Sequence, residues 1–328
     1  MIATTAKLVA DPFSKDLEKK STRDGFGTGT VEAGKANKDI VVLSADLKES
    51  TRAEWFEKEF PERFIEIGVA EQNMATVAAG LAAVGKIPFI TSYAAFSPGR
   101  NYEQIRTTIA LNNFPVKVCG MHAGVSVGPD GATHQMLEDI ALMRALPNMV
   151  VINPSDAEEA RKAVVAAAAH TGPVYLRFGR SNVPVYTTNE TPFQIGKALT
   201  LWESPQPKVA LLATGAMAYN ALSAARALEA EGVGSIVLSV PTIKPLDELA
   251  ILSAARKTGR VVTVEEHQAA GGFGGAITEF LSGTHPVRIH RLGLLDEFGQ
   301  SGEPDELIEH YRLDAHAIAE AARELLRV

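Results

Sequence analysis

The sequence predicts an α/β protein with two domains, a doubly wound parallel-sheet domain followed by a smaller α/β domain. Short apolar runs rich in Val and Ile alternate with longer segments of helical periodicity, a pattern typical of parallel strands joined by crossover helices. The chain has 328 residues, of which 46% are hydrophobic. Because this length exceeds what one compact domain usually needs, we expect two domains.

In the first domain, apolar runs predict strands, and the longer segments between them predict helices. The clearest helix spans residues 155–170, where Ser155 is the expected N-cap, Glu158 lies three residues further on and alanines fill the interior. The expected strands are residues 40–44, 63–67, 87–91, 116–120, 149–153 and 174–178.

A change in composition predicts the boundary between the domains. Residues 186–207 are rich in Thr, Asn, Pro and other polar residues, which is typical of a connection. We assign residues 1–20 to an N-terminal extension, 21–187 to the first domain, 188–205 to a linker and 206–328 to the second domain. In the second domain we expect strands at 209–214, 235–240, 260–265 and 287–291, and helices at 218–231, 270–281 and 315–326.

Composition and charge exclude several classes of protein. The chain has 32 basic and 39 acidic residues and a net charge of -7, which argues against nucleic acid as the main partner. The single cysteine, Cys119, lies in an apolar run, so we expect a buried, unreactive thiol and no disulfide framework. Residues 1–10 lack the features of a signal peptide, and no apolar run approaches the roughly 20 residues of a membrane span. We therefore expect a cytoplasmic protein that does not enter a membrane.

Two glycine-rich segments resemble nucleotide-binding loops without meeting the criteria for one. A dinucleotide loop follows a strand and completes Gly-x-Gly-x-x-Gly, whereas residues 25–29 follow a polar stretch and residues 271–275 lack the final glycine. We interpret both as helix starts or sites of close backbone packing. The sequence also has no phosphate-binding P-loop, no Gly-x-Ser-x-Gly elbow and no paired Cys or His at metal-ligand spacing, so no metal site is expected on this chain.

Two segments carry the residue types that catalysis needs. Glu71 follows an expected strand and begins an alanine-rich helix, which places a carboxylate at the edge where α/β sheets bind ligands. Its alternative role is to complement the dipole of that helix. His134 lies near the end of the turn-rich loop 128–135, and an imidazole there can move protons between hydroxyl groups. Its alternative role is that of a solvent-facing or capping residue.

These two segments together resemble the transketolase family. The resemblance rests on Ile67-Gly68-Val69-Ala70-Glu71-Gln72-Asn73-Met74 and on Asp130-Gly131-Ala132-Thr133-His134-Gln135, at a spacing that also fits. It extends from Thr22-Arg23 through Ser44 to Thr51, Tyr93-Ala94-Ala95-Phe96 and Gln104-Ile105-Arg106 to Thr242-Ile243-Lys244-Pro245-Leu246, and it corresponds to the second half of a full-length transketolase. That half consists of a thiamine diphosphate pyrimidine-binding domain and the transketolase C-terminal domain.

The resemblance implies roles for residues at the cofactor. Glu71 would bond the pyrimidine ring of thiamine diphosphate and promote the imino tautomer that removes the C2 proton. Tyr93 and Phe96 would pack around the aminopyrimidine, with ordinary core aromatics as the alternative. Asp46 and Gln135 match positions near the cofactor without a definite role, and local hydrogen bonding in their loops is the alternative.

It also implies a site for a sugar phosphate. His134 would serve hydroxyls near the reacting carbon as the second catalytic residue, and Asp130 would accept from a substrate hydroxyl. The phosphate would be bound by Arg23, Ser50, His122 and Arg180, since the planar fork of arginine can donate two parallel hydrogen bonds to it. After Phe96 the loop is about one residue longer than the usual family form and has Ser97 in place of an aromatic, so no role is carried over to Arg100.

One part of the family's site is missing from the sequence. The Gly-Asp-Gly motif and downstream Asn that hold the metal and the diphosphate in full-length members do not occur here. The resemblance therefore implies a separate N-terminal subunit that ligates Mg²⁺ (or Ca²⁺), which requires oxygen ligands, and an α2β2 heterotetramer. The alternatives are a deoxyxylulose phosphate synthase-like enzyme, the beta subunit of a 2-oxo acid dehydrogenase, and a catalytically silent binding homologue.

Overall fold

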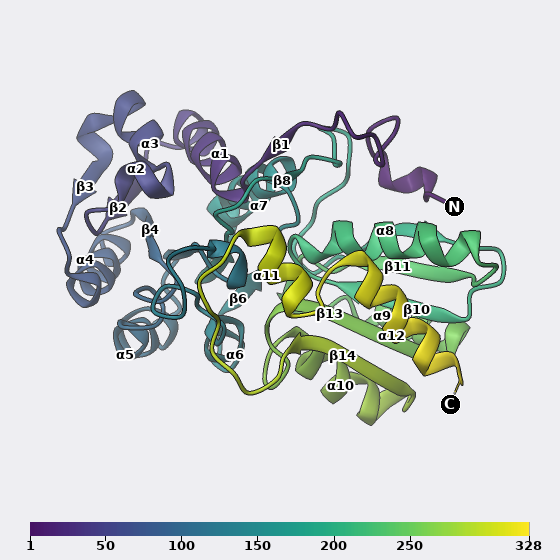
Figure 1. Ribbon diagram of the computed structural model, residues 1–328. Coiled ribbons are helices and arrows are strands. Elements are labelled where there is room, and N and C mark those ends of the chain that lie inside the picture. The colour runs from purple at the N-terminus through teal and green to yellow at the C-terminus, as the bar shows by residue number, and fades with distance from the viewer. Residues whose placement is uncertain (328) are drawn as a thin grey trace.

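Two mainly parallel sheets form the framework of the molecule, with helices on both faces of each (Figure 1). The structure is a computed structural model that describes residues 1–327, and it has the predicted α/β class. The first sheet has the strand order β12-β6-β7-β5-β4-β2-β3. Its strands are β2 (Ile40–Ser44), β3 (Phe64–Glu66), β4 (Ile87–Tyr93), β5 (Lys117–Met121), β6 (Val150–Ile152), β7 (Val174–Arg177) and β12 (Thr242–Lys244).

The second sheet repeats this architecture with fewer strands. Its order is β14-β13-β10-β11-β9, and all neighbouring pairs are parallel except β9 with β11. The strands are β9 (Leu199–Glu203), β10 (Val209–Ala213), β11 (Ser235–Ser239), β13 (Arg260–Gln268) and β14 (Arg288–Leu294). All the strands predicted in the sequence are therefore present, with ends that differ by a few residues.

The helices cover the sheets through apolar faces rich in alanine and branched side chains. In the first domain, α1 (Thr22–Ala36), α3 (Ala53–Glu59) and α7 (Ala157–Ala169) pack on one face, and α4 (Glu71–Ala83), η3 (Ile105–Ala110) and α6 (Asp139–Arg144) on the other. In the second domain, α8 (Met217–Ala230) and α12 (Ala315–Arg327) cover one face, and α9 (Glu248–Thr258) and α10 (Phe273–Thr284) the other. The short elements are η1 (Thr4–Ala6), β1 (Lys19–Lys20), α2 (Lys48–Thr51), η2 (Pro61–Arg63), α5 (Tyr102–Gln104), η4 (Val125–Val127), β8 (Val183–Pro184) and α11 (Pro304–His310).

The two domains are joined by more than the chain connection. One apolar cluster contains residues of both sheets, such as Val118 of β5 and Leu212 of β10. Strand β12 follows β11 in the chain yet pairs antiparallel with β6 at the edge of the first sheet. The N-terminal residues return to the second domain, where the Ala3 N–H donates to the Leu201 carbonyl at 3.0 Å. Figure 1 shows this terminus beside α8.

Two expectations differ from the structure in detail. The predicted linker 188–205 contains β9, because the alternating apolar residues Leu199 and Leu201 fill the core of the second domain. The predicted N-cap Ser155 is wrong by one position: Asp156 caps α7 by accepting the N–H of Glu159 at 2.9 Å. The Glu159 carboxylate accepts the N–H of Ser155 at 2.7 Å, which is the residue before the N-cap, so the two bonds do not form a reciprocal capping box.

The packing interpretation of residues 25–29 is confirmed. These glycines lie inside α1, where it crosses α7 closely. A Cβ atom at Gly25 would lie 2.1 Å from the carbonyl oxygen of Ala157, and one at Gly29 would lie 2.8 Å from Cβ of Val164. Among residues 1–327, no helix has the length and apolar character needed to cross a membrane.

Candidate active site

The residues singled out in the sequence converge on the carboxyl edge of the first sheet. Tyr93 ends β4 and His122 follows β5, and their ring centroids are 4.1 Å apart. Phe96 stacks beside Tyr93 at 6.0 Å with an interplanar angle of 16°, and the His134 ring meets Phe96 edge-on at 5.5 Å. This edge is where parallel α/β sheets bind ligands. We call the rings of Tyr93, Phe96, His122 and His134 the aromatic wall. They come from three separate segments of the chain.

Two cationic side chains, Arg23 and Arg180, lie near His122, and we call them the cationic group. The Arg23 Nη1 atom is 3.1 Å from His122 Nε2 and donates to the Ser50 carbonyl at 2.8 Å. Because a guanidinium can only donate, Nε2 is the acceptor and the proton of the neutral imidazole lies on Nδ1. Burial and the nearby charges of Arg23 and Arg180 lower the pKa of His122 to about 3, so the ring is neutral at physiological pH.

The His122 ring also presents an unsatisfied donor. The side chain is 1% exposed, and its Nδ1 atom has no hydrogen-bond partner within residues 1–327. The backbone at His122 is left-handed, with φ of 54°, which costs energy for a residue with a side chain. A buried donor without a partner is expensive, so this atom is suited to an oxygen of a ligand.

Arg180 and Asp130 pair at the rim of this region. The Arg180 Nη1 atom donates to the Val127 carbonyl at 2.9 Å and to Asp130 Oδ1 at 3.3 Å. Both side chains are partly exposed, so their remaining donors and acceptors face solvent. Ser50 contacts Arg23 through its carbonyl oxygen rather than through its hydroxyl. His134 forms its own local bond, with Nδ1 2.8 Å from the Thr133 hydroxyl.

Glu71 lies at the first turn of α4 and is almost fully buried. Its side chain is 1% exposed, and Oε2 accepts from Arg100 Nη1 at 2.6 Å. The Arg100 guanidinium also lies over the Phe96 ring, 4.8 Å from its centroid. Arg100 therefore links Glu71 to the aromatic wall. The family resemblance gives no role to Arg100, because the longer loop after Phe96 departs from the family pattern.

The two remaining predicted residues are placed differently. Asp46 is exposed, its φ is 59°, and its N–H donates to Glu66 Oε1 at 2.8 Å. Gln135 is 4% exposed, and its Nε2 atom donates to the carbonyls of Val125, Gly128 and Gln300. The structure thus shows loop hydrogen bonds for Gln135. Glu66 was missed in the sequence, and it also accepts the Gly68 N–H at 2.8 Å.

Other candidate chemistry is limited in the described part of the chain. Within residues 1–327 no group of three or more His, Cys, Asp or Glu side chains could hold a metal ion. Cys119 is fully buried, as predicted, and burial raises the pKa of its thiol, which leaves it unreactive. The segment 271–275 opens α10, where the N–H groups of Phe273 and Gly274 donate to the buried Glu265 carboxylate at 2.6 and 2.7 Å.

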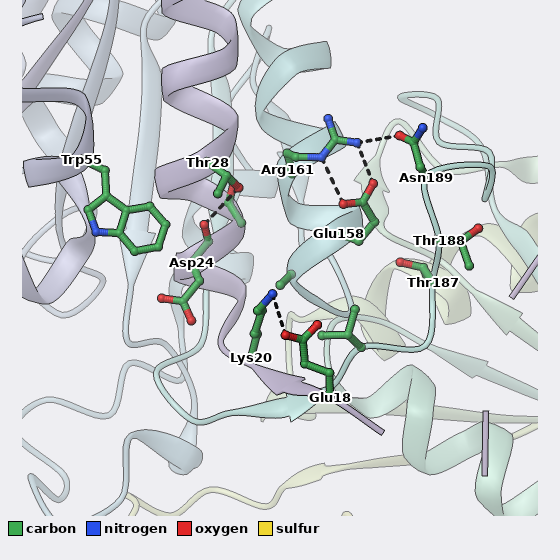
Figure 2. Close-up of a pocket in the computed structure, with 13 residues that line it drawn as sticks. Glu18, Lys20, Asp24, Thr28, Trp55, Glu158, Arg161, Thr187, Thr188 and Asn189 are labelled. Atoms are coloured by element: carbon green, nitrogen blue, oxygen red, sulfur yellow. Dashed lines mark hydrogen bonds and ion pairs between the residues drawn. The ribbon is translucent and has the colours of Figure 1, made fainter. Parts of the chain in front are cut away.

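A separate cavity of about 420 Å³ lies between α1, α7 and residues 185–189 (Figure 2). Four of its five charged side chains pair with one another, since Arg161 binds Glu158 and Lys20 binds Glu18, and the fifth, Asp24, binds Arg52. None of the residues predicted to bind cofactor or substrate lines it. The carboxyl edge of the first sheet therefore remains the candidate active site.

Comparisons with known proteins agree with the fold and show the family of the chain. Residues 18–185 match the family model of the transketolase pyrimidine-binding domain, and residues 196–318 match that of the transketolase C-terminal domain. A putative transketolase C-terminal section from Methanocaldococcus jannaschii is 42% identical over 311 residues, or 94% of this chain and 97% of the relative. Transketolase of Rattus norvegicus is 38% identical over 323 residues, or 98% of this chain and 51% of the relative.

A solved structure described as "Split gene transketolase, inactive beta4 tetramer" superposes with a TM-score of 0.87 at 44% identity, covering 94% of this chain and 98% of the other. Fold and matches together define a member of a thiamine-dependent transferase family. More particularly, the chain belongs to the transketolase family and contains its pyrimidine-binding and C-terminal domains. The comparisons favour transketolase over the deoxyxylulose phosphate synthase and 2-oxo acid dehydrogenase alternatives.

Proposed function

We propose that this chain is the C-terminal subunit of a two-chain transketolase. With its partner it transfers a two-carbon ketol unit from a ketose phosphate to an aldose phosphate. The proposal rests on a continuous series of contacts at the carboxyl edge of the first sheet. Glu71 contacts Arg100, Arg100 lies over Phe96, and the rings lead through His122 to Arg23.

The residues at this edge fit the pyrimidine half of thiamine diphosphate. Tyr93 and Phe96 offer nearly parallel, partly exposed rings against which a flat heteroaromatic ring can pack. The buried Glu71 carboxylate uses Oε2 for Arg100, which leaves Oε1 to exchange a proton with a ring nitrogen. When bound, the cofactor supplies the carbon nucleophile that amino acid side chains lack. The protein's task is to orient the ring, hold that proton and exclude water.

The cationic group fits the anionic end of a sugar phosphate. Arg23 and Arg180 carry the charge, and the neutral His122 adds the unpaired Nδ1–H. His134 contacts the aromatic wall and Asp130 contacts Arg180, so both can hold and position sugar hydroxyls. Both contacts of Arg180, to the Val127 carbonyl and to Asp130, use Nη1, so its Nε and Nη2 atoms can donate to the phosphate.

We propose that a separate N-terminal subunit supplies the diphosphate and Mg²⁺ (or Ca²⁺) site, in an α2β2 heterotetramer. The support is that this chain covers 97% of the Methanocaldococcus jannaschii relative that is described as a putative transketolase C-terminal section. The described residues also offer no cluster of metal ligands. In addition, the similar split-gene structure is a beta-only tetramer that is described as inactive.

The test is co-purification of this chain from its native cell, followed by a ketol-transfer assay with thiamine diphosphate and Mg²⁺. We expect a partner that carries Gly-Asp-Gly, and activity in the mixture but not in either chain alone. A homodimer that binds no cofactor and finds no partner would favour the silent homologue instead.

A further inference from the structure

The loop that carries Asp130 and His134 is attached to the second domain at both ends. We define the substrate loop as residues 124–135, which follow β5 and include η4. Loops normally gain their position from the elements that flank them in the chain. Here one anchoring contact spans 140 positions of the sequence and the other spans 165. They connect the loop to β13 and to the segment 299–301.

The first anchor is Glu266, near the end of β13. Its side chain is 6% exposed, and Oε1 accepts the N–H of Ser126 at 2.5 Å. A Cβ atom at Gly124 would lie 2.3 Å from the same oxygen, so only glycine allows this approach. The carbonyl of Glu266 accepts from Arg177 Nη2 at 2.8 Å, which fixes the end of β13 on the first sheet.

The second anchor is Gln135, at the other end of the substrate loop. Its Nε2 atom donates to the Gln300 carbonyl at 2.9 Å and, within the loop, to the Val125 carbonyl at 3.0 Å. A Cβ atom at Gly299 would lie 1.9 Å from Gln135 Oε1, and one at Gly131 would lie 2.6 Å from the Ser301 hydroxyl. Segment 299–301 therefore packs directly on the substrate loop.

The two anchors are connected to Arg180 and Asp130, which are proposed to bind the substrate. Ser126, held by Glu266, is followed by Val127, whose carbonyl accepts from Arg180. Asp130, in the middle of the substrate loop, contacts the same guanidinium. Displacing the substrate loop would therefore move Asp130 and the orientation of Arg180 together.

We propose that Glu266 and Gln135 are positioning residues through which the second domain sets the substrate loop for binding of the sugar phosphate. This rests on the proposed function, because it takes Arg180 and Asp130 as substrate contacts. The second domain thus determines substrate affinity without contributing a catalytic residue. Glu71 is bound by Arg100 rather than by either anchor, so proton exchange on the cofactor should be independent of them.

The experiment compares Glu266→Ala and Gln135→Ala with the control variant Glu265→Gln, in the enzyme assembled with its N-terminal subunit. Glu265 is a matched control because it is buried on the same strand but is bound by the N-terminus of α10. We expect both anchor variants to raise KM for a ketose phosphate about tenfold or more, with less than about a threefold change for hydroxypyruvate. Glu266→Gln should restore most of the affinity, since an amide oxygen can accept the Ser126 N–H.

Two readouts separate positioning from a general loss of structure. Hydrogen exchange at the thiamine C2 position should stay within about twofold of the wild type in Glu266→Ala. Amide hydrogen exchange of residues 124–135 should accelerate in Glu266→Ala but not in Glu265→Gln. Equal losses with both substrates and in C2 exchange, or an equal KM change in Glu265→Gln, would overturn the proposal.

The amide exchange measurement needs no activity, so it remains informative if the enzyme assay fails. Wild-type enzyme that transfers no ketol unit would contradict the proposed function. Unchanged exchange of residues 124–135 in both Glu266→Ala and Gln135→Ala would contradict the anchoring role itself.

Discussion

The carboxyl edges of the two sheets have the same architecture but differ in what their polar side chains contact. Those at the first edge are available to a ligand, whereas those at the second edge are bound by other parts of the protein. Three residues at the first edge lie at or after strand ends and can contact a ligand. The Tyr93 and Arg180 side chains are partly exposed, and Nδ1 of His122 has no hydrogen-bond partner in residues 1–327. At the second edge, three polar residues near the end of β13 are buried and occupied. Glu265 binds the N-terminus of α10, Glu266 binds Ser126, and His267 Nε2 accepts the Ala141 N–H at 3.4 Å.

The difference shows that the fold alone does not assign chemistry to a sheet edge. A helix N-terminus at such an edge is a ready anion site, but at α10 the protein's own Glu265 carboxylate fills it. The second edge therefore holds the domains together, whereas the first remains available to a ligand. Variants at the two edges, and in the packing behind them, test this difference.

The largest effect is expected at the first edge, from Glu71→Gln. The amide keeps the shape of the side chain but cannot exchange a proton with the pyrimidine ring. We expect C2 hydrogen exchange in the assembled enzyme to fall by about 10² to 10⁴. The exposed neighbour Gln72 provides a control, since Gln72→Ala should leave the rate unchanged. Exchange in Glu71→Gln near the wild-type rate would remove Glu71 from the chemistry.

The next effect is expected for Arg180→Ala. Loss of a charge-assisted bond to phosphate should lower kcat/KM for a phosphorylated donor by about 10 to 100-fold. Hydroxypyruvate, which lacks the phosphate, should be affected far less. Arg312→Ala is the matched control, because Arg312 is exposed and pairs with Glu320 at 3.0 Å. Equal losses with the two donors would show that Arg180 does not bind phosphate.

A structural prediction concerns close packing behind the first edge. Gly25→Ala would place a methyl group 2.1 Å from the Ala157 carbonyl, so we expect a loss of about 1 to 3 kcal/mol in the free energy of unfolding. Gly283, in α10, has open space around it, so Gly283→Ala should gain about 0.5 to 1 kcal/mol from helix propensity. Urea unfolding of the isolated chain measures both. A neutral Gly25→Ala would contradict the close contact of α1 with α7.

A further prediction concerns the pH dependence of stability at His122. Its pKa is about 3 in the folded chain, below the usual 6.5, so the unfolded chain binds the proton first as pH falls. The stability associated with neutral His122 is therefore complete above pH 6.5 and is lost between 6.5 and 3, at up to about 1.4 kcal/mol per pH unit.

His122→Asn removes this titration and tolerates the left-handed backbone. Urea midpoints at pH 7.5 and 5 should differ less in the variant than in the wild type. Identical pH dependence in the two proteins would mean that His122 is not buried as a neutral ring.

The sequence predicted the features that depend on local pattern. Apolar runs located the strands, since each must fill a core face, and the glycines of 25–29 were recognised as packing residues. The contact of Arg100 with Glu71 was not predictable, because it joins residues 29 positions apart through the fold of a loop. The orientation of Gln135 was not predictable either, since its partner Gln300 is 165 positions away and no local signal marks a contact between domains.

The most direct test of the central claim is a titration of this chain into a fixed amount of its N-terminal subunit, with thiamine diphosphate, Mg²⁺ and a ketose phosphate donor. We predict that ketol transfer is absent from either subunit alone, rises with added chain and saturates at equal amounts of the two subunits. Full activity of this chain alone, or an equimolar complex that binds cofactor without transferring a ketol unit, would contradict the account.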